Sequence, residues 1–173
     1  MLLVFCNGAS GVSALDYCKE AQLLQKQGNL AQALKLYTQS LHMEPHRHHV
    51  DKIYNNRGLI YYTQGKHLKA LGDFNKAIEL NSGDSDFYYN RGNVYRVLKM
   101  IDRAIIDYTA AIQLDPQNAL AYNNRGSIYF EKGNLKQAES DYNKAIQCNP
   151  GDTEFYCNRG NLFRSRGQYK RAV

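Results

Sequence analysis

Four Asn-Arg-Gly tripeptides recur in this chain at one constant interval, and each places a carboxamide beside a guanidinium. A carboxamide has one acceptor oxygen and a nitrogen with two donors, so it can pair with both the N–H and the C=O of one peptide unit. A guanidinium presents a planar fork of donors that fits a carboxylate or a phosphate. The asparagines of the four copies are Asn56, Asn90, Asn124 and Asn158. Their even spacing predicts a row of contacts to polypeptide backbone, while the arginines suit an anionic partner.

The arginines of the first three copies each have an aspartate 16 residues further along the chain, which favours a structural role over phosphate binding. The expected pairs are Arg57 with Asp73, Arg91 with Asp107, and Arg125 with Asp141. Residues 14–47 lack both partners and have Glu20 and Leu36 instead. This co-occurrence predicts a partly buried ion pair that fixes the geometry of each repeat more than it adds stability. Guanidinium groups that lay free in a groove would instead favour phosphate.

The elements that carry the tripeptides are predicted to be helix pairs, because a period of about 34 residues is typical of helix–turn–helix solenoids. Tyr54, Gly58 and Tyr61 fall on one helical face, and Ala70 and Phe74 do so after a turn. The small residues let two backbones approach, and the aromatic side chains fill the space beside them. Glycines mark the turns at Gly28, Gly65, Gly133 and Gly167. The remaining turn has Lys99, and we expect a strained turn there.

These residues resemble the tetratricopeptide repeat family over residues 14–173, after a lead-in segment of residues 1–13. The resemblance implies an all-α fold, a right-handed α-solenoid of antiparallel helix pairs. The expected units are 14–47, 51–84, 85–118 and 119–152, with a half unit at 153–173. Two departures from the family pattern are Ser82, where other complete units have Pro, and Ser40, where later units have Ala. We expect Ser82 to soften one junction between units.

In such an array the first helix of each unit lines the concave side, so the four asparagines form a ladder along a groove. Neighbouring helices lie roughly 8–10 Å apart and an extended chain advances roughly 3.3 Å per residue. One rung would therefore meet about every third residue of a peptide. The other candidate peptide-binding residues, which flank or belong to the same helical face, are Tyr62, Asn93, Arg96, Phe130 and Arg164. The ladder resembles that of O-linked N-acetylglucosamine transferases and importins; the alternative is that asparagine is merely a tolerated polar residue.

The charge pattern argues against nucleic acid as the partner. The net charge is +6, but the inner face mixes Lys52 with Asp86 and Glu131 and comes out near neutral. A nucleic-acid binder concentrates its cations in a stripe. The family's carboxylate clamp for chaperone tails is also disfavoured, because no lysine stands at the corresponding places.

Other signals exclude several classes of protein. No apolar segment is long enough to cross a membrane. The four cysteines contain no C-x-x-C pair, which indicates reduced thiols and a cytoplasmic protein. No catalytic constellation or phosphate-cradling loop appears, so we expect no enzyme activity and no cofactor. A histidine cluster, which we interpret as a solvated linker and not as a metal site, comprises His42, His46, His48 and His49 with Glu44 and Asp51 nearby.

The sequence thus predicts a scaffold or adaptor that binds an extended peptide or partner segment in its groove. Two alternatives stay open: the substrate-selecting arm of a larger, glycosyltransferase-like enzyme, and an architectural spacer in a multiprotein assembly. The last helical face, with Tyr156 and Phe163, has no following helix to cover it. We therefore expect either a longer parent protein or self-association through this uncapped end.

Overall fold

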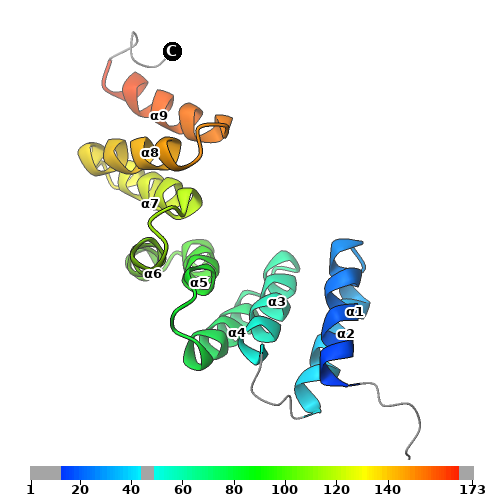
Figure 1. Cartoon of the computed structure of the whole chain (residues 1–173). Coiled ribbons are helices and arrows are strands. Elements are labelled where there is room, and N and C mark those ends of the chain that lie inside the picture. The colour runs from blue at the N-terminus through cyan, green and yellow to red at the C-terminus, as the bar shows by residue number, and fades with distance from the viewer. Residues whose placement is uncertain (1–12, 44–48, 168–173) are drawn as a thin grey trace, which may run out of the picture.

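The computed structural model describes residues 13–43 and 49–167 of the chain, and within these ranges every regular element is an α-helix. Successive helices pack against one another in chain order, and the array winds as a right-handed α-solenoid of antiparallel helix pairs, as predicted (Figure 1). The helices are α1 (Ala14–Lys26), α2 (Leu30–His42), α3 (Val50–Thr63), α4 (His67–Leu80), α5 (Ser85–Val97), α6 (Ile101–Leu114), α7 (Ala119–Glu131), α8 (Leu135–Cys148) and α9 (Thr153–Ser165).

The two helices of a pair approach closely where a glycine of the first meets an aromatic ring of the second. A Cβ atom added at Gly92 would lie 2.8 Å from Cε1 of Tyr108, and one at Gly58 would lie 2.8 Å from Cε1 of Phe74. Both rings are completely buried. Because a buried ring of this size has no room to move aside, the glycine sets the distance between the two helices.

The turns inside the pairs use left-handed backbone. The glycines adopt positive φ angles of 79° at Gly28, 70° at Gly65, 75° at Gly133 and 68° at Gly167. Lys99 has φ 59° in the equivalent turn, which confirms the strain expected there. His49, just before α3, also has a positive φ of 72°, which the sequence did not predict.

Ser40 and Ser82, which depart from the family pattern, lie in different surroundings. Ser40 is buried, and its hydroxyl donates to the carbonyl of Ala14 at 2.7 Å, so it ties α2 to the start of α1. At the junction that holds Ser82, the Asn81 side chain accepts from the N–H of Gly83 at 3.0 Å. The Asn149–Gly151 junction, which contains Pro150, has the same contact at 3.3 Å, and the softening expected from Ser82 stays a prediction.

A second period, two units long, is superimposed on the one-unit period. It is visible at the junctions: Asp84 and Asp152 stand two units apart, and each caps the next helix by accepting a backbone N–H at 3.0 Å. The intervening junction uses Asn118 instead, which accepts the N–H of Ala121 at 2.9 Å. Alternate units are therefore more alike than neighbouring units.

Candidate functional site

The arginines of the tripeptides lie between the helices and form what we call the arginine seam, made of Arg57, Arg91 and Arg125 with their aspartates. Each makes two parallel hydrogen bonds to a carboxylate on the second helix of its own pair. The donor–acceptor distances are 2.7 and 2.8 Å for Arg57 to Asp73, 2.7 and 2.7 Å for Arg91 to Asp107, and 2.8 and 2.8 Å for Arg125 to Asp141. The three carboxylates are buried.

The seam also connects neighbouring pairs, which the sequence analysis missed. Arg91 donates through Nη1 to Oδ1 of Asn75 on α4 at 2.9 Å, and its guanidinium lies 5.6 and 5.7 Å from the ring centres of Tyr88 and Tyr95. The equivalent acceptors for Arg57, Arg125 and Arg159 are Thr38, Thr109 and Asn143. The sequence does contain a pattern that could have predicted these contacts, because a Thr or Asn stands 16 residues before three of the four arginines.

The aspartates of the seam keep the partly buried arginines in their charged form. Hydrogen bonding to Asp73 and Asp107 raises the pKa of Arg57 and Arg91. For Arg125, burial lowers the pKa, but the hydrogen bond and charge of Asp141 outweigh it, so the pKa is raised. These guanidinium groups already have carboxylate, side-chain oxygen and aromatic partners, so they do not offer a free fork to a phosphate in the groove.

The asparagine ladder lies on the first helices, and its amide nitrogens bind the preceding unit. Asn90 donates to Oδ1 of Asn55 at 2.9 Å, and Asn158 donates to Oδ1 of Asn123, also at 2.9 Å. This bond between units was not predicted from the sequence, where each carboxamide was expected to be wholly available to a ligand. In the part of the chain that the structure describes, Asn90 and Asn158 each retain a second N–H and a carbonyl oxygen for a ligand.

The rung at Asn124 is built differently because position 89 holds a tyrosine in place of asparagine. Asn124 donates to Oδ1 of Asn93 at 3.0 Å and lies 3.4 Å from the Tyr89 hydroxyl. The buried Tyr108 hydroxyl donates to the same Asn93 oxygen at 2.7 Å. This chain of contacts links the core of the α5–α6 pair to the groove surface.

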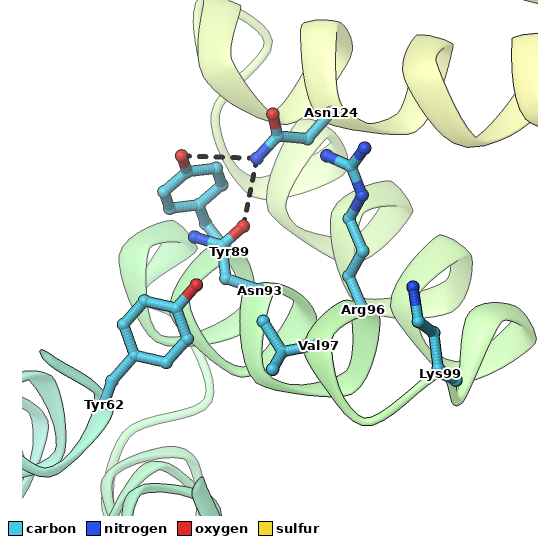
Figure 2. Close-up of a pocket in the computed structure, with 7 residues that line it drawn as sticks. All are labelled: Tyr62, Tyr89, Asn93, Arg96, Val97, Lys99 and Asn124. Carbon is cyan, nitrogen blue, oxygen red and sulfur yellow. Dashed lines mark hydrogen bonds between the residues drawn. The ribbon is translucent and has the colours of Figure 1, made fainter. Parts of the chain in front are cut away.

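A hollow of about 420 Å³ opens beside this rung, and we call it the Arg96 pocket (Figure 2). Tyr62 from α3 and Asn124 from α7 stand on opposite sides of it. The rest of its lining comes from α5 and the turn that follows: Tyr89, Asn93, Arg96, Val97 and Lys99. These described lining residues include no carboxylate. A described acid close by on this face is Glu131, whose Oε1 accepts from Nη2 of Arg96 at 2.9 Å.

The other predicted groove residues lie elsewhere along the array. Asn56 lines a second hollow of about 400 Å³ with Gln22, Gln25 and Lys26 from α1, which we call the Gln22 pocket. Phe130 is half-buried against the Tyr142 and Phe163 cluster. Arg164 and Asn158 are on α9, further along. The structure therefore brings together Tyr62, Asn93, Arg96 and Asn124. The residue pattern did not predict that Tyr89, Lys99 and the amides of α1 line these hollows.

The expectation that Tyr156 and Phe163 are both uncovered is wrong for Phe163. Phe163 is 4% exposed and packs with Tyr142 and Leu162, whereas Tyr156 is 42% exposed. Phe163 belongs to one buried cluster with Ala138 and Tyr142 of the preceding helix.

Two further sequence signals concern metals and membranes. His46 and His48 of the histidine cluster lie outside the described residues; across residues 13–43 and 49–167, no three His, Cys, Asp or Glu side chains gather closely enough to hold a metal ion. Within those same ranges, no helix combines the length and the apolar character needed to cross a bilayer.

The sequence matches the tetratricopeptide repeat family at residues 51–84, 85–118 and 119–152, and a second description of the same repeat matches residues 141–173. It is 37% identical to the photosystem I assembly protein Ycf3 of Acaryochloris marina over 68 residues, which is 39% of this chain and 41% of that protein. The chain thus spans about two fifths of the length of that relative.

Solved structures share the fold at low sequence identity. YrrB, described as a TPR protein with an unusual peptide-binding site, is 22% identical with a TM-score of 0.74, covering 93% of this chain and 81% of that chain. The first TPR of Spaghetti (RPAP3), bound to the HSP90 peptide SRMEEVD, is 23% identical with a TM-score of 0.65, covering 68% of this chain and 93% of that chain. At these identities the likeness shows the fold alone.

Proposed function

This chain belongs to the tetratricopeptide repeat family, whose repeats build protein-interaction modules, and we propose that it is a scaffold whose concave face binds an extended segment of another protein. The observation that carries the proposal is the Asn124 rung beside the Arg96 pocket. There the amides of Asn93 and Asn124 meet a hollow that is also lined by Tyr62. Convergent polar groups around an open hollow are typical of a binding site.

The geometry suits a backbone-binding groove better than a small-molecule site. The Arg96 and Gln22 pockets are separate hollows on first helices of the array, and each contains at least one ladder residue, Asn124 or Asn56. A peptide in extended form would offer N–H and C=O groups to the rungs and side chains to the hollows. The peptide-binding descriptions of YrrB and Spaghetti support the same class of ligand.

The name of the Ycf3 relative supports a role in bringing proteins together during assembly. Nucleic acid is disfavoured as the ligand because the seam arginines are paired with carboxylates and do not form a free basic stripe. We also propose a cytoplasmic location for the protein, because Cys18, Cys148 and Cys157 are free thiols.

The test is selection of binders from a displayed library of dodecapeptides, followed by affinity measurement with synthetic, end-capped copies. Asn90→Ala combined with Asn124→Ala removes two rungs, and we expect about a tenfold loss of affinity from the hydrogen bonds removed. Helicity by circular dichroism should be unchanged. Asn134→Ala is the matched control, because Asn134 is exposed at the start of α8 and caps no backbone N–H. Equal affinity for the double variant and wild type would contradict the proposal.

A further inference from the structure

Lys99 occupies a conformation that the equivalent turns of the array give to glycine. Its φ of 59° matches the 70° of Gly65 and the 75° of Gly133. A side chain at positive φ is strained, and strain of this kind concentrates at functional sites. The Lys99 side chain lines the Arg96 pocket, so the strained turn and the candidate site meet at one residue.

The described lining of the Arg96 pocket has two cations and no carboxylate. Figure 2 shows that Arg96 and Lys99 extend in the same direction, Arg96 from α5 and Lys99 from the turn after it. Asn93 and Asn124 supply amide groups next to them. Such a set of donors suits an anionic oxygen group more than a neutral one.

The chain already shows that a carboxylate fits on Arg96. Glu131 of α7 reaches across to Nη2 of Arg96, and the two side chains are 56% and 34% exposed. An ion pair this exposed is weak and exchangeable. A ligand carboxylate held by both Arg96 and Lys99 can therefore displace Glu131 without breaking a buried contact.

Part of this arrangement recurs two units later. Arg164 stands two units after Arg96, Asn161 stands two units after Asn93, and Phe130 stands where Tyr62 does. Two steps of roughly 8–10 Å between neighbouring helices correspond to about five or six residues of extended chain at roughly 3.3 Å each. The groove thus offers cations at an interval that an extended peptide can match.

We propose that the Arg96 pocket binds the carboxylate of a glutamate or aspartate inside an extended peptide, with Arg96 and Lys99 as its cationic contacts. The pocket sits beside the Asn124 rung, so the acidic side chain enters the hollow while its backbone meets the ladder. A second acidic residue five or six positions away reaches Arg164. This inference rests on the proposed peptide-binding function and gives its ligand a chemical class.

The test uses peptides selected from the dodecapeptide library and resynthesised with acetylated and amidated ends, so that no terminal carboxylate is present. We expect the wild-type protein to enrich peptides with an acidic residue at one position, and glutamine there to weaken binding about tenfold. Lys99→Gln should weaken binding to a similar extent. Lys99→Gly should weaken binding and also raise the melting temperature, because it relieves the strained turn. Glu131→Gln should tighten binding several-fold, because it frees Arg96.

Lys136→Gln is the control for the charge change, since Lys136 is exposed on α8 outside both pockets. Its affinity should equal that of the wild type. Enriched peptides without acidic residues, or acidic peptides that bind Lys99→Gln as tightly as wild type, would overturn the carboxylate assignment and leave the scaffold proposal standing. A phosphoserine replacement that binds far more tightly than glutamate would reassign the pocket to phosphate. No enrichment of any peptide would overturn both proposals.

Discussion

The arginine seam and the concave groove occupy the same helices but follow different periods. The seam repeats in successive units, with the same bidentate arginine–aspartate contact in three consecutive pairs. The groove alternates from unit to unit, because Asn90 and Asn158 bind the asparagine 35 residues earlier, whereas Asn124, with Tyr89 at that position, binds Asn93, 31 residues earlier. The arginine–aspartate contacts of the seam and the asparagine contacts of the groove thus follow different periods.

The difference follows from what each region contacts. The α3–α4, α5–α6 and α7–α8 pairs pack in the same way, and each has the same arginine–aspartate contact. Among the described helices α1 to α9, none covers the open side of the groove, so packing does not hold its side chains to the one-unit repeat. A period of two units there indicates that the groove presents its chemistry in steps twice as long as those of the arginine–aspartate contacts of the seam. Changes in the seam should therefore affect stability, and changes in the groove should affect binding.

The largest effect is expected from Asp107→Ala in the seam. It leaves the Arg91 guanidinium partly buried without its carboxylate, and breaking a buried pair in this way costs about 3–5 kcal/mol. Urea unfolding should show this loss. Asp102→Ala on the same helix is the control, because Asp102 is 86% exposed in its pair with Lys132 and should cost less than about 1 kcal/mol. Similar losses for the two variants would show that the seam is no more than a surface contact.

Gly92→Ala should have the next largest effect. The added methyl group would lie 2.8 Å from the Tyr108 ring, which is completely buried, so overpacking should cost about 1–3 kcal/mol. Gly72→Ala is the matched control in a helix, since a Cβ there meets nothing within 4 Å. It should stabilise the protein by about 0.5–1 kcal/mol through lower backbone entropy in the unfolded chain. Melting curves of the two variants should shift in opposite directions.

Asn124→Ala in the groove should cost only about 1 kcal/mol of folding free energy, the net value of its hydrogen bond to Asn93. Its amide is near water, so Asn93 can be solvated after the change. Chemical unfolding measures this loss, and peptide affinity measured alongside it should fall by a larger factor than for any seam variant that still folds. A loss of stability as large as that of Asp107→Ala would remove the distinction between groove and seam.

Much of the fold followed from the sequence because a repeated unit states its packing several times. Gly58 and Phe74, for example, recur as Gly92 and Tyr108, so their contact could be predicted from helical spacing alone. The strained turn at Lys99 was also predictable, as an exception in a row of glycines. Repetition turns a weak signal in one unit into a strong signal in four.

The groove was less predictable because its contacts join residues on different units. The bond from Asn124 to Asn93 spans 31 residues, while that from Asn90 to Asn55 spans 35, and no fixed offset describes both. Whether an exposed side chain such as Lys99 points into a hollow depends on turn geometry that residue types do not specify. The packing of Phe163 in one cluster with Ala138 likewise depends on how successive helices stack.

The smallest effect at neutral pH is expected from Tyr37→Phe in the core of the first pair. The Tyr37 hydroxyl donates to Oε1 of Gln25 at 2.8 Å, and Gln25 is half-exposed, so losing this bond at pH 7 should cost about 0.5 kcal/mol. Burial raises the pKa of Tyr37 from 10.0 to about 12. Above pH 10 the unfolded chain therefore loses this proton while the folded chain keeps it, so the tyrosine's contribution to stability falls as pH rises toward 12. Below pH 10 the contribution is fully present.

Unfolding free energies measured from pH 8 to 11.5 should show the wild type losing stability faster than the variant, so that the two curves converge and then cross. Parallel curves would contradict this prediction. They would mean that the Tyr37 hydroxyl is solvated in the folded protein and that the core of the first pair is open to water.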